Sequence, residues 1–98
     1  MNTFERTEEF DDWLARLKDK VGRARIALRI RSAEHGNFGD CESVGEGVSE
    51  MRIHHGPGYR VYFIRQGNDW VILLAGGDKS TQQADIRNAL KLARLLKG

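Results

Sequence analysis

The chain has 98 residues, of which 40% are hydrophobic and 31% are charged, with a formal net charge of +2. This length and composition predict a single folded domain over residues 1–98 and exclude a disordered tail. No apolar run approaches the ~20 residues of a membrane-spanning helix, and the start of the chain lacks the basic and apolar regions of a signal peptide. The lone cysteine, Cys41, excludes an internal disulfide framework. We therefore expect a cytoplasmic protein with no membrane partner.

The first third of the sequence has the apolar spacing of two helices. Apolar side chains recur at intervals of three and four residues from Phe10 to Leu17, and Thr7 has the position of an N-cap. Val21-Gly22 is expected to end this helix. A second helix is predicted from about residue 23 to residue 34, with an inward stripe of Ile26, Ala27, Ile30 and Ala33. The segment before Thr7 is too short to assign, although its length suits a small edge strand.

Glycines punctuate the middle of the chain at turn spacing, and segments typical of strands lie between them. Strands are predicted at about 40–44, 48–54, 59–65 and 70–75, joined by short antiparallel connections. The last of these is continuously apolar, which predicts a central strand that is buried on both faces. Trp13 and Trp70 are both expected in the core.

The end of the chain is predicted to be a third helix. Ser80 and Gln83 have the spacing of a capping box, and a stripe follows that consists of Ile86, Ala89, Leu90, Ala93 and Leu96. The order of elements predicts an α+β fold, in which two N-terminal helices pack on a small antiparallel sheet with a C-terminal helix.

Alternation along two predicted strands places a polar group on one sheet face. If Met51, Ile53, Val61 and Phe63 point into the core, the side chains between them point away: Glu50, Arg52, His54, Arg60 and Tyr62. An antiparallel sheet often has one solvated face, so an ordinary wet surface is the alternative to a functional site. Lys79 follows Gly76-Gly77-Asp78 and precedes the third helix, which suits either an anion site or an exposed cation beside a turn.

The remaining polar residues point less clearly to a site. His54 and His55 are adjacent in a strand and are expected to face opposite ways, and with His35 and Cys41 they match no metal-ligand spacing. We expect neither a metal nor a cofactor. Residues 23–31 contain four arginines and no acid. Arg25 and Arg29 share the outer side of this predicted helix, which suits a solvated face, an RNA footprint or a site for an acidic partner helix.

Five blocks of the sequence carry a family resemblance. They are residues 36–40, 47–53, 56–63, 73–82 and 85–86, and the most specific are Gly-Tyr-Arg-Val-Tyr and Gly-Gly-Asp-Lys-Ser-Thr-Gln. With these blocks the chain resembles bacterial toxins of the RelE/ParE superfamily, in the HigB-like branch of addiction module killer proteins. The resemblance spans nearly the whole chain and implies a RelE-like fold.

The resemblance implies that the chain is the toxin of a type II toxin–antitoxin pair. The implied activity of this toxin is that of a metal-independent, ribosome-dependent mRNA endonuclease that blocks translation. Its implied partners are a small cognate helix-turn-helix antitoxin, the ribosome and mRNA, with operator DNA contacted only through the antitoxin. By position, Arg52, Arg60 and Lys79 would clamp the phosphate, and His54 or Glu50 would serve as base. The implied RNA-binding residues are Tyr62, Gln82, Arg25 and Arg29.

Two other functions stay open at this point. The ParE branch implies a non-enzymatic toxin that inhibits DNA gyrase, and a third reading is an inactive toxin that binds its antitoxin as a corepressor. The chain has Glu50 where several RelE-type relatives carry a lysine, and residues 82–85 where they carry a catalytic tyrosine.

Overall fold

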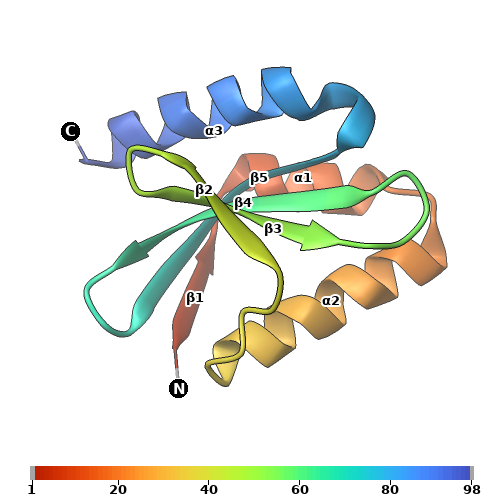
Figure 1. Cartoon of the computed structure of the whole chain (residues 1–98), viewed down its shortest axis with the longest axis horizontal. Coiled ribbons are helices and arrows are strands. Elements are labelled where there is room, and N and C mark those ends of the chain that lie inside the picture. Colours follow the sequence, from red (N-terminus) through yellow and green to blue (C-terminus); the bar gives the residue numbers. More distant parts are fainter. Residues whose placement is uncertain (1, 98) are drawn as a thin grey trace.

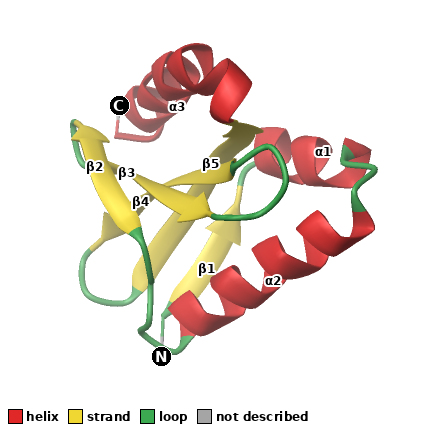
Figure 2. Ribbon diagram, turned by 45° about the vertical axis from the view of Figure 1, so that its right-hand side comes forward, coloured by secondary structure: helices red, strands yellow, loops and turns green. Residues whose placement is uncertain are grey.

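Two helices cover one face of a twisted sheet and a third helix covers the other face in the computed structural model, which describes residues 2–97 (Figures 1 and 2). The helices are α1 (Glu8–Arg16), α2 (Lys20–Glu34) and α3 (Gln82–Lys97). The strands are β1 (Thr3–Arg6), β2 (Cys41–Gly45), β3 (Val48–Ile53), β4 (Tyr59–Gln66) and β5 (Trp70–Asp78). The α+β class predicted from the order of elements is confirmed.

The five-stranded sheet is mixed, with the strand order β1-β5-β4-β3-β2. Strands β2 to β5 pair antiparallel with their neighbours, whereas β1 pairs parallel with β5. The predicted antiparallel pairing is confirmed for β2 to β5, whereas the parallel strand β1 makes the sheet mixed. Strands β1 and β5 are far apart in the sequence, so no hairpin obliges them to run in opposite directions. The unassigned segment before Thr7 is this edge strand.

The first core layer lies between the sheet and the pair α1–α2, where Phe10, Ile26 and Met51 are completely buried. The Thr7 hydroxyl accepts the Phe10 amide proton at 3.1 Å and donates to the Leu74 carbonyl at 2.6 Å. The predicted N-cap of α1 therefore also fastens this helix to β5.

Helix α2 begins three residues earlier than expected, because Asp19 is its N-cap and accepts the Gly22 amide proton at 2.9 Å. Gly22 was expected to end the first helix, but it lies inside the second. A Cβ at Gly22 would collide with the Tyr59 ring and with Asp19, so the missing side chain lets α2 approach β4. Ala27, expected to face inward, is exposed.

Helix α3 covers the opposite face of the sheet, over a second core layer that includes Val48, Leu74 and Ala89. It does not begin at a Ser80 cap. Asp78 caps a 3-10 turn over Lys79–Thr81 by accepting the Ser80 amide proton at 2.8 Å, and α3 follows from Gln82. The other end is held at the β2–β3 turn, where Arg94 pairs with the Glu46 carboxylate.

Strand β5 lies inside the sheet, between β1 and β4, and residues 71–75 are buried as predicted. Trp70 is 46% exposed instead of lying in the core, because it opens β5 beside the hairpin turn, opposite Gln66. Within residues 2–97, no helix combines the length and the apolar character needed to cross a membrane.

Asp19, the N-cap of α2, makes the free energy of unfolding depend on pH. Hydrogen bonds from the Gly22 amide and the Tyr59 hydroxyl hold the pKa of Asp19 below its usual 3.8. A lowered folded-state pKa contributes stability that is present above the unfolded-state value and lost as the pH falls through the folded-state value. We expect Asp19→Asn, which keeps a cap acceptor without titrating, to lose less unfolding free energy than the wild type between about pH 5 and about pH 2. Urea unfolding at both pH values measures this, and equal losses would contradict it.

Candidate active site

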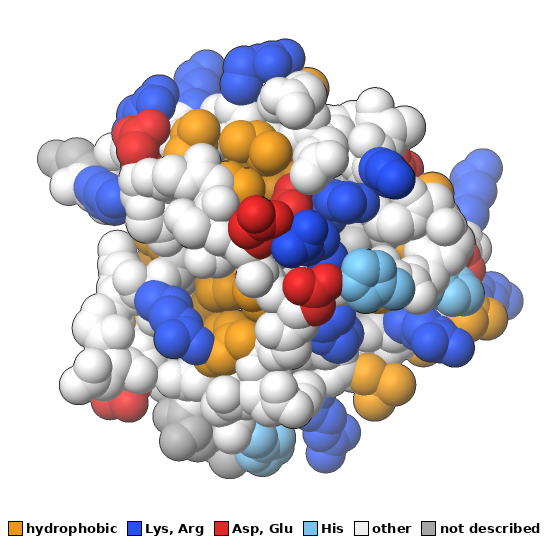
Figure 3. Space-filling model, viewed as in Figure 1, with side chains coloured by type: hydrophobic (Ala, Val, Ile, Leu, Met, Phe, Trp, Pro, Cys, Tyr) orange, Lys and Arg blue, Asp and Glu red, His pale blue; other side chains and the backbone are white. Residues whose placement is uncertain are grey.

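The three cations singled out from the sequence converge on one cavity of about 450 Å³. Arg52 of β3, Arg60 of β4 and Lys79 at the start of the 3-10 turn all line it. Its other walls are His54, His55 and the turn at residues 56–58. The strand register explains the convergence, since Arg52 lies opposite Arg60, and Arg60 lies opposite Gly77, two residues before Lys79. Basic, acidic and histidine side chains gather near the centre of the face shown in Figure 3.

A buried carboxylate lies behind Arg60. Glu50 is only 2% exposed, and its Oε2 accepts hydrogen bonds from the Tyr62 hydroxyl and from the Gln82 side-chain amide, both at 2.9 Å. The same oxygen lies 3.7 Å from Arg60 Nε. Burial, and then the bond to Glu50, raise the pKa of Tyr62 above its usual value, so that its hydroxyl keeps its proton and donates.

The sheet face expected to be solvated is therefore dry where α3 crosses it. Tyr62 is completely buried and Glu50 nearly so, because the first turn of α3 and its Gln82 side chain lie over them. Alternation along β3 and β4 correctly placed these residues on one face, but the wet surface expected there was wrong for Glu50 and Tyr62.

Arg60 is positioned by the turn between β3 and β4. Its Nη1 donates to the Gly58 carbonyl at 2.7 Å, and its side chain is 12% exposed. Gly58 has a φ of +80°, and a Cβ there would lie 3.0 Å from Arg60 Nη1 and 3.5 Å from Lys79 Cβ. Glycine at this position therefore lets Arg60 and Lys79 approach the same part of the cavity.

Arg52 is balanced by carboxylates on its other side. Its Nη2 lies 2.9 Å from Glu42 Oε2 and 3.5 Å from Asp40 Oδ1. Within residues 2–97, Nε of Arg52 and Nε of Arg60 are buried without a hydrogen-bond partner. Buried donors in this state are rare and costly. Arg60 Nε faces the buried Glu50 Oε2 at 3.7 Å, so this pair attracts by charge without forming a hydrogen bond.

Two histidines at the cavity each have a carboxylate neighbour. His54 Nε2 lies 2.6 Å from Asp40 Oδ2, and this bond lowers the Asp40 pKa below its usual value. His55 Nε2 lies 3.6 Å from Asp19 Oδ2. Both histidines line the cavity, although their rings pair with carboxylates from different segments of the chain. Strand β3 ends at Ile53, so strand alternation does not extend to the two histidines.

Sequence reasoning therefore missed His55 as a site residue. The only signal for it was its place just before the Gly56-Pro57-Gly58 turn, where a strand must end.

The two arginines assigned to RNA on the second helix have different surroundings. Arg25 is exposed and lies outside the cavity. Arg29 does not share its outward position, because Arg29 donates to the backbone carbonyls of Phe38 at 3.0 Å, Asp40 at 3.3 Å and Arg52. It fastens α2 to the loop before β2 and to β3. Within residues 2–97, no group of three or more His, Cys, Asp or Glu side chains is arranged to hold a metal ion.

Comparison with known proteins assigns the family. The model of the family described as "Phage derived protein Gp49-like (DUF891)" matches residues 8–97. The chain belongs to this family, which is RelE-like and associated with toxin–antitoxin addiction modules. It is also similar to an "Uncharacterized protein" of Haemophilus influenzae, with 51% identity over 90 residues, or 92% of this chain and 91% of the relative.

The bonds around Glu50 should act as a unit. Tyr62→Phe removes one donor to a buried charge, which we expect to lower the free energy of unfolding by about 1–3 kcal/mol. Glu50→Gln weakens the same bond, so the double variant should lose less than the sum of the single losses, by at least about 0.5 kcal/mol. Urea unfolding of all four proteins closes this cycle, and additive losses would show that the bond carries no coupling.

Proposed function

We propose that the chain is the toxin of a type II toxin–antitoxin pair, with residues 1–98 as a single RelE-like domain and the cavity as the site of an mRNA endonuclease that works on the ribosome. The observation that carries the proposal is the convergence of Arg52, Arg60 and Lys79, from three separate segments, on a cavity that also holds two histidines. Family membership supports the toxin–antitoxin association. The proposed setting is the cytoplasm, with a small helix-turn-helix antitoxin, the ribosome and mRNA as partners, and operator DNA reached only through the antitoxin.

Such a site cleaves RNA without a metal by internal transfer. The 2′-oxygen attacks the adjacent phosphorus, a 2′,3′-cyclic phosphate forms, and the bond to the 5′-oxygen of the next nucleotide breaks. A base removes the proton of the 2′-hydroxyl and an acid gives a proton to the departing 5′-oxygen. The phosphoryl oxygens gain negative charge in the transition state, which Arg52, Arg60 and Lys79 would stabilise.

The two histidines are the cavity residues whose side chains can each accept or donate a proton. We assign His54, which is 75% exposed and paired with Asp40, as the base. His55, beside Asp19, is then the acid. A carboxylate partner orients an imidazole and stabilises its protonated form.

Glu50 is better suited to positioning than to proton transfer, because its Oε2 already accepts two hydrogen bonds and its side chain is buried. In the proposal it holds Arg60 in place, while Tyr62 and Gln82 hold Glu50. Arg25 and Arg29 have no part in the chemistry.

Removing the cavity cations should abolish cleavage. Arg52→Ala, Arg60→Ala and Lys79→Ala should each lower the cleavage rate by about 10²–10³, the usual cost of losing one stabiliser of transition-state charge. Lys91→Ala, which removes an exposed lysine of α3, is the matched control. The measurement is the mapping of mRNA 5′ ends after induction, beside growth curves. Growth arrest with intact messages would reject the endonuclease, and DNA damage in the arrested cells would indicate that the target is gyrase. Normal growth after induction would indicate an inactive corepressor.

The proton-transfer assignment has its own test. His54→Ala and His55→Ala should each lower single-turnover cleavage by about 10²–10⁴ and remove one limb of its pH profile. His35→Ala, at an exposed site outside the cavity, should leave both unchanged. A two-limbed profile that survives in His55→Ala would exclude His55 as the acid.

A further inference from the structure

Helix α2 exposes large apolar side chains outside the stripe that it buries against the sheet. Val21 is 56% exposed and Leu28 is 66% exposed, and Ala24 between them is exposed as well. The spacing of three and then four residues puts all three on one stripe. The opposite stripe of the same helix, with Ile26 and Ile30, already packs on the sheet. Folding of this chain therefore leaves a second apolar stripe of α2 uncovered.

This outer stripe forms part of a groove between α2 and the end of β3, with a volume of about 530 Å³. Val21 and Leu28 line it from the helix and Ile53 from the strand. Arg25 and Arg29 also line the groove, and its lining includes no acidic residue. The groove therefore combines apolar side chains with positively charged ones.

The groove also touches the candidate active site. His54 lines both the groove and the cavity that holds Arg52, Arg60 and Lys79. A chain segment seated against Leu28 would thus extend to the edge of the cavity and cover His54.

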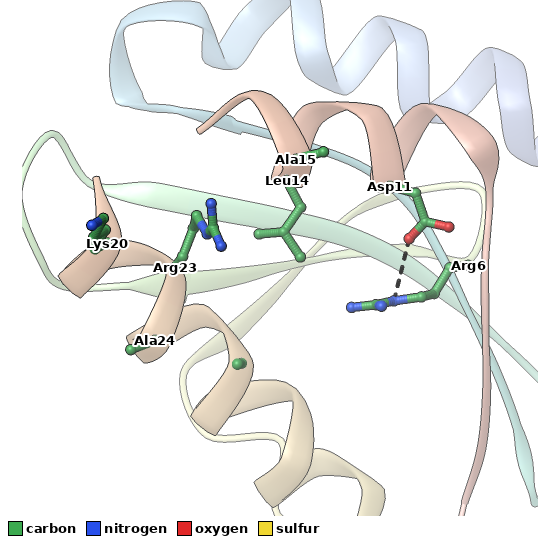
Figure 4. Close-up of a pocket in the computed structure, with 8 residues that line it drawn as sticks. Arg6, Asp11, Leu14, Ala15, Lys20, Arg23 and Ala24 are labelled. Atoms are coloured by element: carbon green, nitrogen blue, oxygen red, sulfur yellow. Dashed lines mark ion pairs between the residues drawn. The ribbon is translucent and has the colours of Figure 1, made fainter. Parts of the chain in front are cut away.

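A second groove, of about 610 Å³, lies on the other side of α2 against α1, and it too has basic side chains in its lining. Figure 4 shows Arg6 pointing to Asp11, with which it pairs at 3.5 Å, while Leu14 and Arg23 lie further along. Unlike the groove between α2 and β3, this groove shares no lining residue with the cavity that holds Arg52, Arg60 and Lys79.

We propose that the groove between α2 and β3 binds an acidic amphipathic helix of the cognate antitoxin, an inference that rests on the proposed function. Apolar side chains of that helix would pack on Val21 and Leu28, and its Asp or Glu side chains would pair with Arg25. An RNA strand has no aliphatic side chains to cover Leu28. A second copy of this chain would bring two arginine-rich faces together, which like charges disfavour.

The experiment places an acid in the groove. Leu28→Glu adds a negative charge at a side chain that is already 66% exposed, so the fold should tolerate it. The matched control is Leu95→Glu, at a side chain of α3 that is 69% exposed. The probe is the purified product of the reading frame beside the toxin gene, titrated by calorimetry into wild type and variants. We expect Leu28→Glu to weaken binding by at least about tenfold and Leu95→Glu to leave it unchanged.

Two further measurements complete the test. Arg25→Glu should also weaken binding, and it provides a second variant if circular dichroism shows that Leu28→Glu has not folded. Without antitoxin, Leu28→Glu should cut mRNA at the wild-type rate, because Leu28 lies outside the cavity.

The outcomes separate the groove from the proposed function. Wild-type affinity in folded Leu28→Glu and Arg25→Glu would overturn the groove assignment, even if the wild type arrests growth and cuts mRNA. If Leu28→Glu lost cleavage but bound the antitoxin normally, the groove would be a contact site for RNA or the ribosome. That result would also overturn the assignment of the groove to the antitoxin. A wild type that binds the probe but never cuts mRNA would refute the endonuclease, while the variants' affinities still decide the groove. No binding of the probe to the wild type overturns the inference.

Discussion

The buried carboxylate of Glu50 is the constraint on which the cationic site depends. Moving a carboxylate out of water costs several kcal/mol unless partners replace the lost hydration. Here the partners come from β4 and from the first turn of α3, through Tyr62, Arg60 and Gln82. The β3–β4 register, the docking of α3 and the place of Arg60 are therefore satisfied together. A shift in any of them would leave a buried charge without compensation.

The surrounding backbone serves the same arrangement. Two arginines lie opposite each other on neighbouring strands, a pairing that like charges disfavour. Glu50 offsets the charge of Arg60, and Asp40 and Glu42 offset that of Arg52. Gly77 completes the arrangement, because a Cβ there would collide with the Asp85 carboxylate and push the start of α3 away from β5. The cavity thus combines concentrated positive charge with a rigid, densely bonded support, which is the preorganisation that charge stabilisation requires.

Helix α2 links the cavity to the outer surface. Arg29 donates to the Arg52 carbonyl from one side of the helix, while Leu28, the next residue, stays exposed on the other. His54 borders both regions. In the proposed function, this adjacency lets a protein partner block the cavity by covering its edge, without entering the space between the cations.

Periodicity along the chain predicted the α+β class, the order of the elements after β1, and the shared face of Glu50, Arg52, Arg60 and Tyr62, because helix and strand periodicities are local properties of the chain. The family resemblance grouped Lys79 with Arg52 and Arg60, and all three line the cavity. Contacts between distant segments make β1 join the sheet in parallel and place α3 over the face around Glu50, where it excludes water. Such contacts also decide that Arg29 bonds to backbone carbonyls and that His55 reaches the cavity. Each of these depends on which distant segment packs where, and periodicity along one strand or helix carries no information about what covers it.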